Sequence, residues 1–146
     1  MKRILLLTVI VVMAVAGAAL AARPHRGATY TGRIERASNV TFPISFTVSK
    51  SGKKVSSFKL PDSYPVYCQG GGFPALGNGG SGAVANKGTF TVRLPLRNLR
   101  TNAAEGSLIV SGKFGAGASA SGKVRTDIAG SAFKTCNGTS PFTAKT

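Results

Sequence analysis

The sequence predicts an all-β fold, a single antiparallel β-sandwich of eight or nine short strands with one disulfide, after an N-terminal signal segment. Apolar and polar residues alternate with a period of two through most of the chain beyond residue 28, as in strands with one buried and one solvated face. Clusters of glycine, proline and serine interrupt the alternation at fairly even spacing. The regular amphipathic period of a helix is missing from this part of the sequence. A closed β-barrel is the alternative architecture.

Residues 1–21 are expected to be a signal peptide. Two basic residues precede an uncharged run over residues 4–20, and small residues surround Ala21, where we expect cleavage. A retained anchor is the alternative, and only then would the protein contact a membrane, because the run is at the short end of what spans a bilayer. Residues 22–28 are polar and aperiodic, so we expect a flexible segment there and the domain over residues 29–146. The protein is therefore expected to be secreted or extracytoplasmic, with cell-surface association as an option.

Four strands are expected in the first half of the domain, separated by turns at Ser38-Asn39, Lys50–Lys53 and Pro61–Ser63. The apolar phase slips before Phe58, which predicts a β-bulge near Ser56-Ser57. The expected strands are Tyr30–Ile34, Phe42–Val48, Lys54–Leu60 and Tyr64–Cys68.

The second half is organised around a hairpin over Ser107–Ile128, whose two arms alternate on either side of the turn Gly115–Gly117. Before it, the seven glycines of Gln69–Asn86 predict a long surface loop. Arg97–Gly106 is a polar crossing that could hold one helical turn. The remaining expected strands are Thr89–Leu96, Ala132–Cys136 and Pro141–Lys145. The inward parity of the strands predicts a core of Phe42, Ile44, Phe46, Val48, Phe90, Val92, Leu94, Leu108, Val110, Phe114 and Val124.

The two cysteines, Cys68 and Cys136, are expected to form one disulfide. An exported chain enters an oxidising compartment, and an even cysteine count there favours a bridge. Closing so long a loop should stabilise the fold by roughly 4 kcal/mol through chain entropy.

The basic charge of the domain points to anionic partners. Loss of residues 1–21 leaves 17 of the 19 basic residues against all four acidic ones, a net charge of +13. Such a field attracts anionic polymers, although it can also serve only to keep a β-protein soluble. Outward parity selects Arg33, Lys113, Lys123 and Arg125 as candidate polyanion-binding residues. Lys113 and Lys123 flank one turn at similar distances, so we expect them to lie near one another.

Catalytic and cofactor chemistry have little support in the sequence. His25 is the only histidine and lies in the expected flexible segment, so a nucleophile–histidine site is not expected. Gly117–Lys123 matches the start of a phosphate-binding P-loop, but Val124 stands where serine or threonine should bind magnesium. One histidine, two cysteines and scattered acidic residues make no metal site. We therefore expect a non-enzymatic protein without cofactors, and a small glycan hydrolase using a carboxylate pair is the enzymatic alternative.

Three aromatic residues beside the glycine-rich stretch, Tyr64, Tyr67 and Phe73, are candidates for stacking on sugars. The alternative is that they cover the edge of the core. Nucleic acid is not expected as a partner, because the strands carry no RNP-like motif of aromatic and basic residues.

Several spaced features together resemble a loose group of small exported β-domain proteins of high-GC Gram-positive bacteria. They include the Tyr30-x-Gly32 and Gly112-x-Phe114 pairs, the run Ser121–Val124, the inward Cys68 and the late Cys136-Asn137-Gly138. The group carries no assigned activity and no established binding residues. The resemblance therefore implies a β-fold, an exported location and a bacterial source, and it carries over no site.

The favoured hypothesis is a secreted binding or envelope-associated module that engages anionic polymers or polysaccharide through its basic faces. A structural or protein-interaction domain that uses its charge for solubility is the alternative, and the hydrolase is the third. The sequence predicts no oligomeric state.

Overall fold

The computed structural model describes residues 22–36, 39–69, 71–128, 136 and 138–146. These residues contain ten strands and no α-helix, and all pairings between the strands are antiparallel. The expected all-β fold is therefore confirmed. The strands are β1 Thr29–Glu35, β2 Thr41–Val48, β3 Lys54–Lys59, β4 Tyr64–Cys68, β5 Gly71–Leu76, β6 Gly79–Ala83, β7 Thr89–Asn98, β8 Ala104–Gly115, β9 Ser119–Asp127 and β10 Thr139–Lys145.

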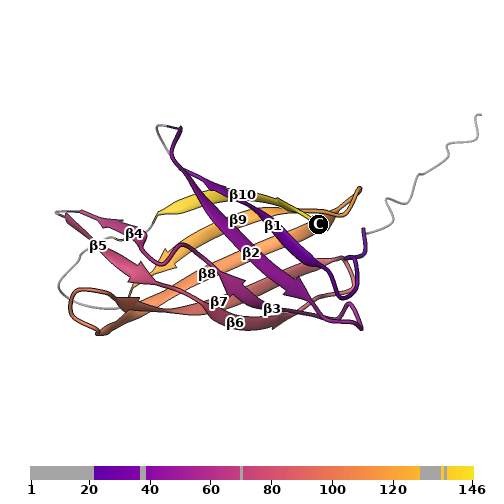
Figure 1. Ribbon diagram of the computed structural model, residues 1–146, viewed down its shortest axis with the longest axis horizontal. Coiled ribbons are helices and arrows are strands. Elements are labelled where there is room, and N and C mark those ends of the chain that lie inside the picture. Colours follow the sequence, from indigo (N-terminus) through magenta and orange to yellow (C-terminus); the bar gives the residue numbers. More distant parts are fainter. Residues whose placement is uncertain (1–21, 37–38, 70, 129–135, 137) are drawn as a thin grey trace, which may run out of the picture.

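The strands form one sheet that curls into a half-barrel (Figure 1), in place of the expected two-sheet sandwich of eight or nine strands. The order across the sheet is β4-β5-β7-β8-β9-β10-β1-β2-β3-β6. The consecutive strands β5 and β6 stand near its two ends: Leu76 pairs with Arg97 of β7, and Gly79 pairs with Phe58 of β3. The chain itself thus ties the ends together, so one curled sheet can enclose the core without a second sheet.

The long surface loop expected over Gln69–Asn86 is wrong, because this stretch contains β5 and β6. Several of its glycines are required by close packing. A Cβ atom at Gly80 would lie 2.4 Å from Leu94, and one at Gly82 would lie 2.3 Å from the carbonyl oxygen of Thr91, both on β7. Because glycine has no side chain, a glycine-rich strand shows no alternation of apolar and polar residues, and these strands could not be recognised in the sequence.

Most other local predictions agree with the structure. The bulge is confirmed: the β2–β3 register shifts by one residue, and Ser57 has φ of 55°. The hairpin Ser107–Ile128 is confirmed as β8 and β9, which pair from Ser107–Asp127 to Gly115–Ser119. The polar crossing is confined to the short connection between β7, which ends at Asn98, and β8, which begins at Ala104, and it holds one helical turn: the N–H of Asn102 donates to the carbonyl oxygen of Asn98. The strand expected over Ala132–Cys136 and the turn residue Ser38 lie outside the described residues, apart from Cys136 itself.

The concave side of the sheet is filled by a cluster of aromatic rings. Phe46 stacks between Tyr30 and Phe58, with ring centroids 5.2 and 4.9 Å away, and Phe90, Phe114 and Phe142 surround it. Ten of the eleven predicted core residues are buried, and Phe42 is partly buried against the core. The parity of large apolar side chains therefore predicted the buried face correctly, and its list contains ten of the 24 buried apolar residues that the structure describes.

Glycines on neighbouring strands allow the sheet to bend. A Cβ atom at Gly32 would lie 1.8 Å from the carbonyl oxygen of Thr143, and one at Gly122 would lie 2.0 Å from that of Ser111. Both contacts are with backbone, which cannot rotate away. The two glycines therefore mark places where the strands approach more closely than any side chain allows.

We expect Gly122→Ala to lower the free energy of unfolding by about 1–3 kcal/mol, the usual cost of an added carbon in a tightly packed site. Urea denaturation measures the change. Gly138→Ala is the matched control, because no atom lies within 4 Å of its added Cβ, and it should stay within about 0.5 kcal/mol of the wild type. Equal effects of the two substitutions would contradict the role assigned to Gly122.

One end of the half-barrel is covered by residues 22–28, and we call it the capped end; it is the right-hand end in Figure 1. The backbone N–H of Gly27 donates to the carbonyl oxygen of Ser49, and that of Val48 donates to Ala28. The N–H of His25 donates to the hydroxyl of Tyr30 at 3.0 Å. The expected flexible segment thus has defined partners on β1 and on the β2–β3 turn. Within the described ranges, no helix is long and apolar enough to cross a membrane.

The predicted disulfide is confirmed, with Cys68 bonded to Cys136 across 68 positions of sequence. It connects the last residue of β4, at one end of the sheet, to the segment that leads into β10, in the middle of the sheet.

Candidate functional site

The convex side of the sheet carries the candidate polyanion-binding residues, and we call it the outer face. Strand alternation turns apolar residues inward and leaves lysine, arginine, serine and threonine outward. One row of paired residues crosses four strands: Lys113 of β8 pairs with Ser121, Ser121 with Thr143, and Thr143 with Arg33 of β1. The sheet register thus places cations and hydroxyl groups side by side on a continuous surface.

Lys113 and Lys123 occupy diagonal positions and do not stand directly opposite one another. Lys113 pairs with Ser121, whereas Lys123 pairs with Ser111. Diagonal neighbours on paired strands are about 7–8 Å apart at their backbones. The two ammonium groups can therefore bind successive anionic groups of one ligand, and the sheet does not hold the two lysines in contact with each other.

The outer face is hollowed around Gly32. Two adjoining hollows of about 390 and 300 Å³ share Thr31 and Gly32, and we call them together the outer groove. Its charged lining residues are Arg33, Lys145 and Lys59. The groove lies over the backbone of Gly32, where β1 approaches β10 closely. Its other lining residues are Thr143 and Ala144 on one side and Pro43, Ile44, Ser45 and Leu60 on the other.

The sequence analysis did not select Lys145 and Lys59. Both have the outward parity of their strands, next to the buried Ala144 and Phe58. That signal was present in the sequence, but their position beside Arg33 depends on the pairing of β10, β1, β2 and β3, which lie far apart along the chain.

Two ion pairs reduce the charge of the outer face only in part. Arg33 lies 3.6 Å from Glu35, and Arg93 lies 2.9 Å from Asp127. All four side chains are largely exposed, so these pairs are weak and screened by salt. The other candidate cations, Lys113, Lys123, Arg125 and Lys145, form no ion pair with any residue that the structure describes.

The carboxylates are spread over separate elements. Glu35 and Asp127 face arginines, Glu105 accepts a hydrogen bond from the amide of Asn98, and Asp62 lies between β3 and β4. The described part of the chain brings no three of histidine, cysteine, aspartate and glutamate together.

Of the three candidate aromatics, Tyr64 and Phe73 are buried on β4 and β5, and only Tyr67 is exposed, at 65% of its surface. The guanidinium of Arg36 lies 4.9 Å from the ring centroid of Tyr64 and 5.1 Å from that of Tyr67. Cation–π contacts of this kind anchor the β4–β5 hairpin to the end of β1. Tyr67 also lines a shallow hollow with Arg100, away from the outer groove.

Comparison with known proteins gives no match: no family model, no curated protein and no solved structure matches the chain. Function therefore has to be inferred from the residues of the sites themselves.

Proposed function

We propose that the protein is a non-enzymatic, extracytoplasmic binding module that holds an anionic polymer of the cell envelope along its outer face. The observation that carries this proposal is the outer groove, whose cations Arg33, Lys145 and Lys59 continue onto Lys113 and Lys123 of the neighbouring strands. The disulfide agrees with folding in an oxidising compartment.

The chemistry of the groove favours phosphate- or sulfate-bearing polymers over neutral polysaccharide. Thr31, Thr143 and Ser45 line it beside the cations, and hydroxyl groups donate hydrogen bonds to anionic oxygens as readily as to sugars. Within the described residues, the exposed aromatic ring is that of Tyr67, which lies on β4 at the end of the sheet and does not line the outer groove. Stacking on sugars or bases is therefore a poor match, and electrostatic attraction is the stronger driving force.

We expect the protein to bind heparin, a generic polyanion, and purified anionic envelope polymer with steep salt dependence. Lys113→Gln/Lys123→Gln should lower the slope of log K against log salt concentration by about two, since each lysine lost is one fewer counterion-releasing contact. Binding isotherms at several salt concentrations measure this slope for each variant.

The control is Arg100→Gln, compared with the single variants Lys113→Gln and Lys123→Gln; it removes one charge from the turn between β7 and β8, outside the outer face. It should keep the slope of the wild type, whereas each lysine variant should lower it by about one. If the lysine variants bind like Arg100→Gln, or if binding ignores salt, the outer face is not the site and the charge serves solubility instead.

A further inference from the structure

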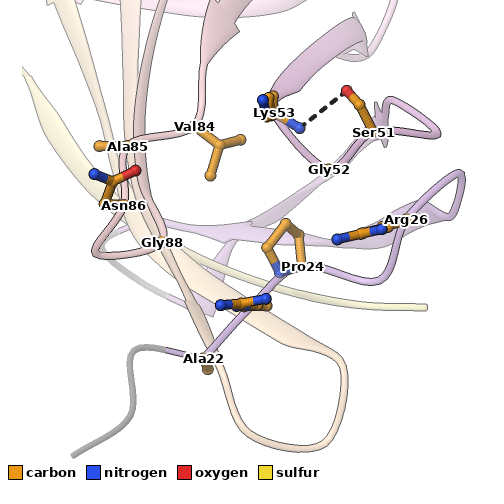
Figure 2. A pocket seen from close by; sticks show the side chains of 11 residues that line it. Ala22, Pro24, Arg26, Ser51, Gly52, Lys53, Val84, Ala85, Asn86 and Gly88 are labelled. Atoms are coloured by element: carbon orange, nitrogen blue, oxygen red, sulfur yellow. Dashed lines mark hydrogen bonds between the residues drawn. The ribbon is translucent and has the colours of Figure 1, made fainter.

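A second basic site lies at the capped end, where a cavity of about 280 Å³ opens between three separate segments (Figure 2). Arg23 and Arg26 come from the covering segment, and Lys53 comes from the turn between β2 and β3. Asn86, from the turn between β6 and β7, lines the opposite side together with Ala85 and Val84. The cavity is separate from the outer groove and shares none of its lining residues.

Tight turns build this cavity. A Cβ atom at Gly52, where φ is +74°, would lie 3.2 Å from Cγ of Arg26, so the arginine side chain packs directly over the turn. At the other side, a Cβ atom at Gly88 would lie 2.5 Å from the carbonyl oxygen of Ala22. Residues 22–28 thus contact a turn near each of their two ends, and Arg26 packs against the turn between β2 and β3.

The distribution of charge along the molecule favours anions at this end. The chain has only four acidic residues, and all of them lie at or beyond the opposite ends of their strands: Glu35 ends β1, Asp127 ends β9, Glu105 is near the start of β8, and Asp62 follows β3. Six residue steps separate the two ends of β1, about 20 Å in an extended strand. This distance is more than twice the Debye length of about 8 Å at physiological ionic strength.

Basic residues, by contrast, gather at the capped end without an acidic neighbour. Lys50, Lys54 and Lys87 lie on or beside the same turns as the cavity. The field of these groups adds to that of Arg23, Arg26 and Lys53, and a concave site concentrates it.

We propose that this cavity binds a single phosphate or sulfate group, an activity beyond polymer binding on the outer face. The planar guanidinium groups of Arg23 and Arg26 match the geometry of an oxyanion, and the ammonium of Lys53 adds a third cation. The amide of Asn86 supplies a neutral hydrogen-bond donor at the same cavity. Its volume of about 280 Å³ is just below the range for ligand pockets, about 300–1,000 Å³, so it suits a small charged group.

The test is calorimetric titration of the purified protein with inorganic phosphate and with sulfate, against chloride at equal ionic strength. We expect the wild type to bind phosphate or sulfate, and Arg26→Gln/Lys53→Gln to bind about tenfold more weakly or worse, because a lost charge-assisted hydrogen bond has at least that effect. The matched control is Lys113→Gln/Lys123→Gln, with the same loss of charge on the outer face. It should stay within about twofold of the wild type, since those lysines do not line the cavity.

Folding of the variants is checked by their unfolding midpoints without ligand. Lys53→Gln alone guards against misfolding, because its hydrogen bonds at this turn are made by its backbone; it should still weaken phosphate binding. Equal binding by wild type and Arg26→Gln/Lys53→Gln would overturn the site, as would equal loss in the outer-face control. Neither outcome bears on heparin binding by the outer face, so the two proposals fail separately.

A last arm separates two sources of the ligand. An envelope polymer with terminal phosphomonoesters is compared with the same polymer after phosphatase treatment, each in competition with inorganic phosphate. If the untreated polymer displaces phosphate and the phosphatase-treated polymer does not, the ligand is a polymer end. If neither polymer displaces phosphate, the ligand is the free anion.

Discussion

Phe46→Ala should lower the free energy of unfolding by about 3–5 kcal/mol, a large share of the 5–15 kcal/mol typical of a domain. Phe46 is completely buried and its ring contacts five others. Its removal leaves a cavity that the surrounding rings cannot fill, because each is fixed on a different strand of the curled sheet. Urea denaturation followed by circular dichroism measures the change.

Tyr67→Ala is the control for loss of an aromatic ring. Tyr67 is mostly exposed and lies outside the ring cluster, so its loss should remove little beyond its contact with Arg36, about 0.5–1 kcal/mol. A Phe46→Ala protein that unfolds at the wild-type midpoint would mean that the ring cluster does not hold the sheet together.

Removing the disulfide with Cys68→Ala/Cys136→Ala should cost about 4 kcal/mol. The bridge closes a loop with a sequence separation of 68, and the entropy that it removes from the unfolded chain grows with the logarithm of loop length. The unfolding midpoint in urea, compared between wild type and variant under oxidising conditions, measures the effect.

Reductant supplies the control for this experiment. It should shift the midpoint of the wild type towards that of the variant and leave the variant unchanged. An oxidised wild type whose intact mass equals that of the reduced form would contradict the bridge itself, since oxidation removes two hydrogens.

The predictability of the fold from the sequence depended on side-chain size. In β2 and β8, large apolar residues recur at every second position over most of the strand, so parity identified the strands and the buried face. In β6 the residues are Gly79 to Ala83, nearly all without a side chain to pattern. The same glycines that permit β6 to lie against β7 hid the strand.

For the candidate sites, the sequence predicted which single residues face outward, but not which of them lie close together. Outward parity identified Lys113 and Lys123, because the hairpin that contains them is local in sequence. The outer groove joins Lys145 to Lys59 through four strands, and the capped-end cavity depends on how residues 22–28 lie over distant turns. Both arrangements follow from long-range pairing, which periodicity does not encode.

The position of β10 also determines the order in which the protein can be assembled. It is the last strand along the chain, yet it stands in the middle of the sheet, between β9 and β1. In a chain that is synthesised or exported with its N-terminus first, β1 and β9 each keep one unpaired edge until residues 139–145 are present to pair with them. The sheet is complete only when these residues have paired on both sides, and unpaired strand edges are prone to wrong pairing until then.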